Sequence, residues 1–378
     1  MKINFVGAVR DSSGYAEFAR SFVAALHDIG ADLAVEPLSF EPSHSNHGRY
    51  GEICNKLTAY RHNKIDVNVI NMIPKVYDNF RKPNAMNIGF TMFETNRVPK
   101  IWAQQCNTMD AILVPCQWNK EVFINSGVTV PVEVCPPGVD ASLYPIKKQL
   151  TGNQKKYKFY SIFQWSERKN PYGLIKAFMA AFSGNSDVSL TLKTYVKDYS
   201  KKEQEFLVNE ITSMKKTVTL PHSPFIFLRH EKLSTQQMQE FHLSHDCFVL
   251  PTRAEGFGLP YIEAMMMGNP AIGTRYSGNL EFMTDQNSYL LDAQLTPVAN
   301  MGHIGPWYDG SMLWAEPDLS QLIEYMQNVY ANQDDARNKA VAARDSLLSN
   351  IGWEKQAQHF LNTIERLYAD WQSRRAGG

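Results

Sequence analysis

An alternation of short apolar segments with helical segments constrains the fold of this chain more than any other feature. In the first half, the strand-like segments are residues 2–7, 31–38, 65–70, 87–92, 111–115 and 132–135. Helical periodicity marks residues 15–26 and 118–126 between them. Strands that alternate with helices pair in parallel, so the sequence predicts an α/β fold with a doubly wound sheet.

The alternation restarts after residues 141–156, which are polar and basic and contain proline and glycine. We interpret this segment as an interdomain linker with solvated lysines. Strand-like segments recur at residues 158–163, 188–194, 225–228, 246–250 and 271–273. Because 378 residues exceed one ordinary core, we expect two domains, at residues 1–150 and 151–352. A last amphipathic helix is predicted to begin at Trp353.

Composition excludes several classes of protein. Hydrophobic residues make up 44% and charged residues 20%, which is typical of a folded chain. The 38 basic and 38 acidic residues cancel, so bulk electrostatic binding of nucleic acid is not expected. Five scattered cysteines favour reduced thiols over disulfides or a zinc site. With no signal peptide and no run long enough to span a membrane, we expect a cytoplasmic protein, peripheral at a membrane at most and without stable insertion.

Two features of the first half could bind ligands. Gly14 stands between a strand-like and a helical segment, where it either lets the backbone approach a phosphate or sugar or serves as a turn residue. Residues 39–64 are polar and are predicted to form a loop that could meet an acceptor. His44 and His47 in that loop lack a third metal ligand, so a solvated loop is favoured over a metal site.

The stretch from Glu255 to Glu263 carries the strongest functional signal. It follows the apolar residues 247–251, and two glycines and a proline open a helical segment. A strand, a glycine turn and a helix start form an anion site, because the first helical N–H groups lack internal partners. Two carboxylates eight residues apart flank that site, which suits the phosphates and hydroxyls of a nucleotide sugar. The alternative is a plain strand–turn–helix with solvated glutamates.

Several short motifs stand in order along the chain. They are Gly14-Tyr15 with Ala19-Arg20, Gly138-Val139-Asp140, Arg168-Lys169-Asn170-Pro171, Glu255-Gly-Phe-Gly-Leu-Pro-x-x-Glu263 and Ser277-Gly278-x-x-Glu281. Together they resemble the motifs of the retaining glycosyltransferases of family 4. The block from Glu255 to Glu263, which resembles the family's E-x7-E signature, is the most specific.

The resemblance implies the GT-B fold, in which two Rossmann-like doubly wound domains face each other across a cleft. Residues 1–150 would bind the acceptor, and residues 151–352 would bind a nucleotide-diphosphate sugar. The C-terminal helix, residues 353–375, would cross back to the first domain. The implied reaction moves a sugar to an acceptor hydroxyl with retention of configuration. It needs no metal ion and no cofactor, which agrees with the absence of an Asp-x-Asp motif.

The resemblance also implies roles for individual residues. Glu263 would hold the ribose hydroxyls, since a carboxylate accepts two hydrogen bonds from a vicinal diol. Glu255 would lie against the donor sugar, and Lys169 would neutralise the departing diphosphate. Backbone N–H groups would meet the diphosphate or sugar around Phe257, Gly258 and Leu259.

The chain departs from the family pattern in two places. Gln164 stands where many relatives carry an arginine, and Arg168 is the substitute, although adjacent side chains usually diverge and Lys169 is preferred. Glu94 stands near the position of a family histidine and is predicted to contact the donor sugar or the acceptor. By position, Arg229 and His230 are expected near the nucleotide base, with a surface role for Arg229 as the alternative.

The acceptor stays open at this point. A glycan or a lipid-linked saccharide is the common case in the family, and a modified nucleobase or a protein is the alternative. Nucleic acid would therefore take part only as an acceptor. The alternative from another functional class is a module that binds sugar nucleotides but does not catalyse transfer. An epimerase would need ionisable pairs for proton abstraction, and a phosphorylase would need a cofactor lysine in a longer chain; neither is visible.

Overall fold

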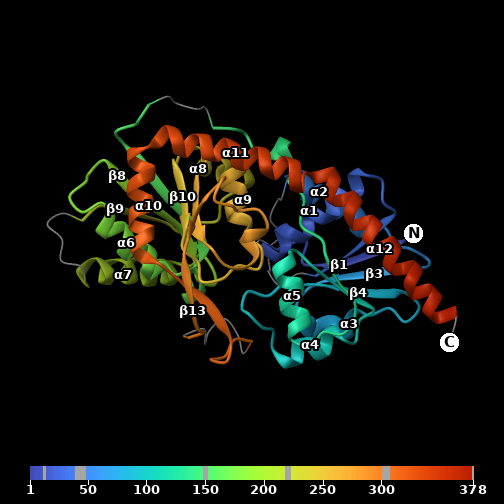
Figure 1. Ribbon diagram of the computed structural model, residues 1–378. Coiled ribbons are helices and arrows are strands. Elements are labelled where there is room, and N and C mark those ends of the chain that lie inside the picture. Colours follow the sequence, from blue (N-terminus) through green and yellow to red (C-terminus); the bar gives the residue numbers. More distant parts are fainter. Residues whose placement is uncertain (12–13, 39–47, 148–151, 218–222, 300–306, 377–378) are drawn as a thin grey trace. The chain divides into compact units, whose positions relative to one another are not determined.

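The computed structural model describes residues 1–378 except 12–13, 39–47, 148–151, 218–222, 300–306 and 377–378. The described chain forms two compact units. The first contains Met1–Asp140 and Leu348–Gly378, and the second contains Ala141–Leu347. In each unit, helices flank a parallel sheet (Figure 1). No helix in the described ranges is both long and apolar enough to cross a membrane.

The first unit is built on a parallel sheet with the strand order β2-β1-β3-β4-β5-β6. The strands β1, β3, β4 and β5 are buried along their whole length, as expected for a sheet covered on both faces. The elements are β1 Ile3–Gly7, α1 Gly14–Asp28, β2 Leu33–Pro37, α2 Gly48–Thr58, β3 Val67–Asn71, η1 Pro74–Val76, α3 Tyr77–Phe80, β4 Met86–Phe90, α4 Lys100–Cys106, β5 Ala111–Val114, α5 Gln117–Asn125, β6 Val132–Val134 and α12 Trp353–Ala376.

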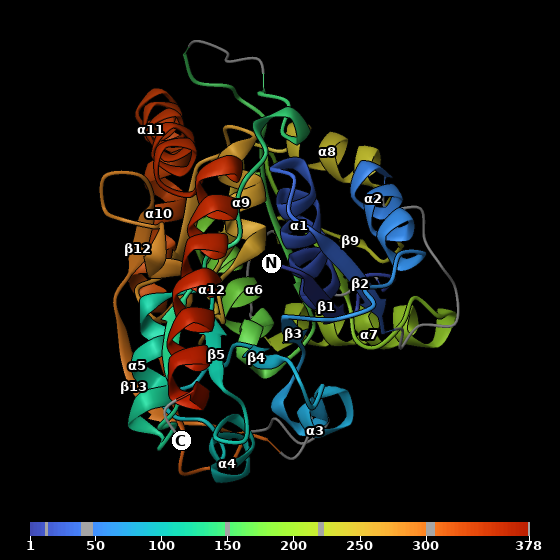
Figure 2. The ribbon, with the colours of Figure 1, turned by 90° about the vertical axis from the view of Figure 1, so that its right-hand side faces the viewer.

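The C-terminal helix α12 packs on the first unit, against α1 (Figure 2). The ring of Phe360 lies 5.1 Å from that of Phe22, centroid to centroid. Val139 pairs with Gly352 where the chain returns, and a Cβ on Gly138 would lie 2.9 Å from the Cα of Trp353. Glycine is therefore required at position 138 so that the returning chain can approach.

The second unit has the strand order β12-β11-β10-β7-β8-β9, also parallel, and a separate antiparallel pair of β13 and β14. Together with the first sheet, this confirms the predicted doubly wound α/β fold. The elements are η2 Ala141–Leu143, β7 Tyr157–Gln164, η3 Glu167–Lys169, α6 Pro171–Ala181, β8 Val188–Tyr195, α7 Lys201–Thr217, β9 Phe225–Arg229, α8 Thr235–Leu243, β10 Cys247–Leu250, α9 Leu259–Met266, β11 Ala271–Thr274, η4 Ser277–Glu281, β12 Tyr289–Leu291, β13 Ala293–Pro297, β14 Leu313–Pro317, α10 Leu319–Ala331 and α11 Gln333–Ile351.

Two local predictions are wrong. Residues 39–64 are not a loop throughout, because Gly48–Thr58 form helix α2 and bury Tyr50 and Ile53; His44 and His47 lie outside the described residues. The lysines of the predicted linker are not all solvated. Lys147 Nζ donates to Asp246 Oδ1 and to the carbonyl of His245, both at 2.6 Å.

Candidate functional site

The strand order of the second unit brings two loops together at one edge of its sheet. Strand β7 pairs with β8 on one side and with β10 on the other, so the direction of winding reverses between β7 and β10. Doubly wound sheets bind ligands at the carboxyl ends of the strands that flank such a reversal. The loop after β7 carries Arg168 and Lys169, and the loop after β10 carries Glu255.

Hydrogen bonds fasten these two loops to each other. The backbone N–H of Arg253 donates to the carbonyl of Arg168 at 2.7 Å, and Thr252 Oγ1 donates to the same carbonyl at 3.0 Å. In return, the Arg168 guanidinium donates to the carbonyl of Ala254 at 2.8 Å. The Arg253 side chain binds Glu316 on β14 through two nitrogens, at 2.5 and 3.1 Å. The site is therefore braced from both sides before any ligand binds.

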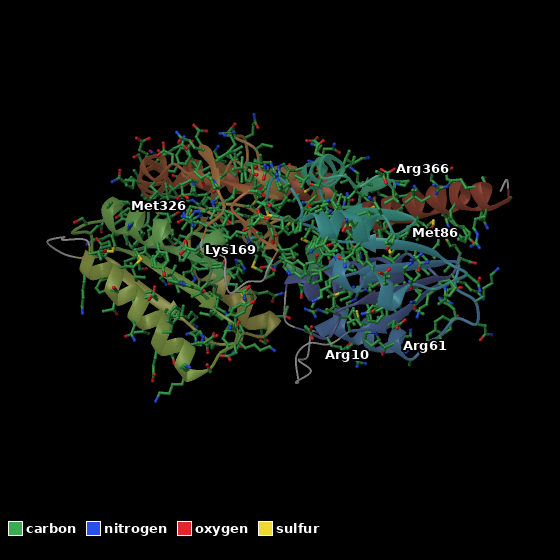
Figure 3. All side chains as sticks on the ribbon, turned by 90° about the horizontal axis from the view of Figure 1, so that it is seen from below. Arg10, Arg61, Met86, Lys169, Met326 and Arg366 are labelled. Carbon is green, nitrogen blue, oxygen red and sulfur yellow. The ribbon has the colours of Figure 1, made fainter. Side chains whose placement is uncertain are left out.

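Lys169 and Glu255 form a buried ion pair where the loops after β7 and β10 meet, a place that we call the junction. Lys169 is labelled in Figure 3. Lys169 Nζ lies 2.5 Å from Glu255 Oε1, and the two side chains are only 10% and 6% exposed. The Arg168 guanidinium lies 3.5 Å from Glu255 Oε2. Burial alone would raise the pKa of Glu255, but the charges of Lys169 and Arg168 outweigh it and hold that pKa below its ordinary value. Glu255 is therefore a carboxylate rather than a proton donor at neutral pH.

The residue after Lys169 fixes where the lysine points. Asn170 adopts a left-handed conformation, with φ of 53°, and its side-chain oxygen accepts a hydrogen bond from the N–H of Gly173 at 3.1 Å. This N-cap ends η3 and starts α6 within one residue. The abrupt change of direction leaves Lys169 on the inner side of the loop, where it meets Glu255.

Close backbone packing shapes the turn after Glu255. The N–H of Gly278 donates to the carbonyl of Glu255 at 3.0 Å, and a Cβ on Gly278 would lie 2.3 Å from the carbonyl oxygen of Gly256. Ser277, with φ of 70°, accepts the N–H of Glu255 on its Oγ at 2.8 Å. Gly258 then turns with φ of 102° and precedes α9 without a side-chain cap. Pro260, the second residue of α9, has no N–H group, and the N–H of Tyr261 donates to the carbonyl of Gly258 at 3.0 Å. Anion binding by the N–H groups around Phe257, Gly258 and Leu259 therefore stays a prediction.

Glu263 lies about one turn into α9, and its side chain is 27% exposed. Its Oε2 lies 3.7 Å from Nε2 of His242, a side chain that is fully buried. The carboxylate is thus open to a ligand on one side and faces a buried imidazole on the other.

Arg229 and His230 stand apart from this junction. Arg229 is the last residue of β9 and His230 follows it, and two strands, β7 and β8, separate β9 from β10. Arg229 is 54% exposed along its side chain and pairs with Glu231 at 2.5 Å. The His230 ring packs against Tyr199 at 5.4 Å, with Nε2 3.9 Å from Glu203. Their predicted contact with a base therefore stays a prediction.

Gly14 and Glu94 belong to the first unit. Gly14 is the first residue of α1, and a Cβ built on it would meet nothing within 4 Å. The hydroxyl of Tyr15 lies 2.9 Å from Thr91 Oγ1, in the segment that leads to the half-buried Glu94. Burial raises the pKa of Tyr15 to about 12, and the nearby charge of Glu94 adds to this effect. The contact of both residues with ligands remains a prediction.

Two contributors to the junction were missed by sequence reasoning. Arg253 lies between the apolar strand and Glu255, but nothing local indicates its partner Glu316, 63 residues away. Ser277 was part of a recognised motif, yet its left-handed conformation and its bond to Glu255 could not be read from the motif.

A pocket of about 280 Å³ lies beside the same β7 loop, and it contains none of the predicted site residues. Three of its seven lining residues are aromatic, and the lining comes from the segments after β7 and β8 and from α6 and α7. The lining residues are Trp165, Ser166, Glu167, Tyr172, Val196, Lys197 and Phe206.

Comparison with known sequences finds a family model that matches the part of the chain carrying this site. A family model described as "Glycosyl transferases group 1" matches residues 145–297. Over 125 residues, the chain is 30% identical to the sucrose synthase of Nitrosomonas europaea, covering 33% of this chain and 13% of that protein. Over 183 residues, it is 24% identical to the sucrose synthase of Melioribacter roseus, covering 48% and 20%. The matches thus span no more than a fifth of the length of these curated relatives.

Solved structures share the fold at low sequence identity. Sucrose-phosphate synthase from Thermosynechococcus elongatus matches with a TM-score of 0.68 and 15% identity, over 98% of this chain and 100% of that chain. Anabaena HepE, in complex with UDP and glucose, matches with a TM-score of 0.65 and 15% identity, over 97% and 100%. These neighbours confirm the expected GT-B class of fold. Residues 145–297, which match the model of the group 1 glycosyltransferases, include Lys169, Glu255 and Glu263.

Proposed function

We propose that this protein is a retaining glycosyltransferase that moves a sugar from a nucleotide-diphosphate sugar to an acceptor hydroxyl. The observation that carries the proposal is the buried Lys169–Glu255 pair at the point where the winding of the second sheet reverses. That point offers a cation, a carboxylate and helical N–H groups within two adjoining loops. A sugar diphosphate needs this combination, because it joins a polyanion to a ring of hydroxyls.

In this proposal, Lys169 and Arg168 stabilise the leaving diphosphate. Negative charge grows on the bridging oxygen as the bond from sugar to phosphate breaks, and cations fixed in advance lower the barrier to that step. An ammonium group has three protons, so Lys169 can bridge Glu255 and a phosphate oxygen. The N–H groups of Phe257, Gly258 and Leu259 add donors at the start of α9. The reaction then needs neither a metal ion nor a cofactor.

Glu255 acts as a fixed anion beside the donor sugar. Its lowered pKa keeps it ionised, which suits acceptance of a hydrogen bond from a sugar hydroxyl and attraction of positive charge on the ring. An oxocarbenium-like transition state carries such a charge. Glu263 holds the ribose hydroxyls one helical turn further on. Arg229 and His230 are proposed to lie toward the base.

We propose a saccharide as the acceptor, either a glycan or a lipid-linked one, bound on the first unit near Gly14 and Glu94. A modified nucleobase or a protein side chain is the alternative. The structural neighbours suggest a donor class to try first, since Anabaena HepE was solved with UDP-glucose.

A thermal-shift screen of UDP, GDP, ADP and their sugar conjugates tests the proposal. The correct donor should raise the unfolding midpoint, because a ligand that binds only the folded state stabilises it. Release of free sugar or transfer to an added saccharide should follow with the same donor. Binding without any turnover would favour the non-catalytic module, and no binding of any nucleotide would refute the proposal.

A further inference from the structure

A buried polar network lies directly beneath Glu263 and has no role in the chemistry described so far. It joins Tyr160 on β7, His242 on α8 and Asn269, which follows α9. All three residues are fully buried. Helix α9, which carries Glu263, is thus connected to the central strand of the sheet through side chains rather than through apolar packing alone.

We propose that His242 is a positioning residue, which directs the carboxylate of Glu263 toward the ribose hydroxyls of the donor. The inference rests on the proposed function, because it assumes that Glu263 binds a ribose. It assigns a task to a side chain that itself touches neither donor nor acceptor.

The hydrogen bonds of Asn269 determine the direction of every bond in the network. Its Nδ2 donates to the backbone carbonyl of His242 at 2.9 Å, and a carbonyl can only accept. The amide orientation is therefore fixed. The second proton on Nδ2 goes to the hydroxyl oxygen of Tyr160, also at 2.9 Å. Since this oxygen accepts from Asn269, the hydroxyl proton of Tyr160 is left to donate elsewhere.

The Tyr160 hydroxyl donates to His242 and thereby selects its tautomer. The oxygen lies 2.7 Å from Nδ1 of His242. Burial holds the pKa of Tyr160 well above its ordinary value, so the hydroxyl keeps its proton. Nδ1 must then be the acceptor nitrogen, and a neutral imidazole with an acceptor Nδ1 carries its proton on Nε2.

The Nε2–H group of His242 faces Glu263. Nε2 is buried without a hydrogen-bond partner in the described part of the chain, and Glu263 Oε2 at 3.7 Å lies just beyond hydrogen-bond distance. A buried donor left unsatisfied is costly, so the imidazole favours carboxylate conformations that bring Oε2 closer. Torsion about the Glu263 side chain suffices for that movement. The carboxylate would then be held from beneath and present its other lone pairs to a ribose diol.

The test compares the binding of UDP and 2′-deoxyUDP by calorimetry, with the GDP and ADP pairs run alongside. His242→Phe fills the same space without a donor, and His242→Gln returns an N–H near the position of Nε2. We expect His242→Phe to weaken UDP binding about tenfold, the scale of one hydrogen bond to a charged group. Binding of 2′-deoxyUDP should weaken less, so the preference for the ribonucleotide shrinks. His242→Gln should restore most of that preference.

Two further variants separate positioning from mere folding. Tyr160→Phe removes the bond that fixes the tautomer and should reduce the ribose preference in the same direction by a smaller factor. In a Glu263→Gln background, His242→Phe should have little additional effect on the preference, because the two residues act on one contact.

Provided that the wild-type protein binds UDP, two results would overturn this inference and leave the proposed function standing. One is an unchanged ribose preference in His242→Phe. The other is an equal loss of affinity for both nucleotides together with a lowered unfolding midpoint, which indicates a structural role only. If wild type binds none of the nucleoside diphosphates, the proposed function fails and this inference fails with it.

Discussion

The two units have closely related sheets, but they use charge differently at the carboxyl edge. In the first unit, the segment after β1 is held by Arg20, which is buried on α1. Its guanidinium donates to the carbonyls of Val9 and Asp11, at 3.2 and 2.6 Å, and to Glu17 at 2.6 Å. The arginine is thus a structural clamp. In the second unit, the loop after β7 is held by hydrogen bonds from Thr252 and Arg253 to the carbonyls of Arg168 and Glu167. The Lys169 side chain instead pairs with Glu255.

Under the proposed function, this difference places the contact with the charged diphosphate in the second unit. Arg20 donates to two carbonyls and to Glu17, so it holds the segment after β1 in place. A lysine in a braced loop, next to a single carboxylate, is arranged for a polyanionic ligand. The first unit offers helix α1, the Tyr15 hydroxyl and the half-buried Glu94, which suit a neutral acceptor.

The largest expected effect follows from removing the cation of the second unit. Lys169→Ala should lower kcat about a thousandfold, the scale of one lost electrostatic contact in a transition state. Steady-state turnover of the donor found in the nucleotide screen measures this. Lys176→Ala, an exposed lysine on α6, is the matched control and should behave like wild type. Near-normal turnover of Lys169→Ala would remove the lysine from the leaving-group role.

Alanine variants of one glycine in each unit compare how closely the backbone is packed at the two positions. Gly278→Ala places a Cβ 2.3 Å from a backbone oxygen, and we expect a loss of about 3 kcal/mol in the free energy of unfolding. Gly14→Ala enters open space at a helix start, and we expect a gain of about 0.5 kcal/mol. Urea denaturation compares the two variants. Equal stabilities would contradict the difference in backbone packing.

Gly14→Ala also separates the two interpretations of this glycine. If the backbone at Gly14 approaches a phosphate or sugar, kcat/KM should fall although the fold is intact. If kcat/KM stays at the wild-type value, Gly14 is a turn residue and its predicted ligand contact is wrong.

Glu263→Ala tests the donor contact further along α9. We expect the donor KM to rise about tenfold with a smaller change in kcat, because the ribose contact is made in both ground and transition states. Glu205→Ala, on the exposed face of α7, serves as the control. A fall in kcat at unchanged KM would instead place Glu263 in the chemical step.

The lowered pKa of Glu255 predicts how stability changes with pH. A carboxyl whose pKa is lower in the folded state contributes stability above its unfolded pKa of about 4.3, and this stability is lost as pH falls through the folded value. Unfolding free energies of wild type and Glu255→Gln should therefore converge as the pH falls below the unfolded pKa and through the lower folded pKa of this carboxyl. A difference that stays constant with pH would show that Lys169 does not stabilise the carboxylate.

Much of the fold followed from the sequence because its signal is local. The helix predicted at residues 15–26 is found as α1, Gly14–Asp28. Helix α2 was missed because residues 48–58 are largely polar and only a few side chains, such as Tyr50, are buried. The pair of β13 and β14 was missed because a long connection separates Ala293–Pro297 from Leu313–Pro317, so no turn signal marks it.

The sequence predicted which residues belong to the candidate site, but it did not predict which of them contact one another. Lys169 and Glu255 are 86 residues apart, and no periodicity encodes their pairing. Only the motif resemblance brought them into one site. The tautomer of His242 and the bracing by Arg253 depend on partners from several elements, which a single sequence does not specify.

A crystal structure of the protein with UDP bound tests the central claim most directly. We predict phosphate oxygens within hydrogen-bond distance of Lys169 Nζ and of the N–H groups at the start of α9. We also predict ribose hydroxyls against Glu263. Phosphate bound at the β1 edge of the first unit, beside Gly14, with Lys169 still bonded only within the protein, would contradict this claim.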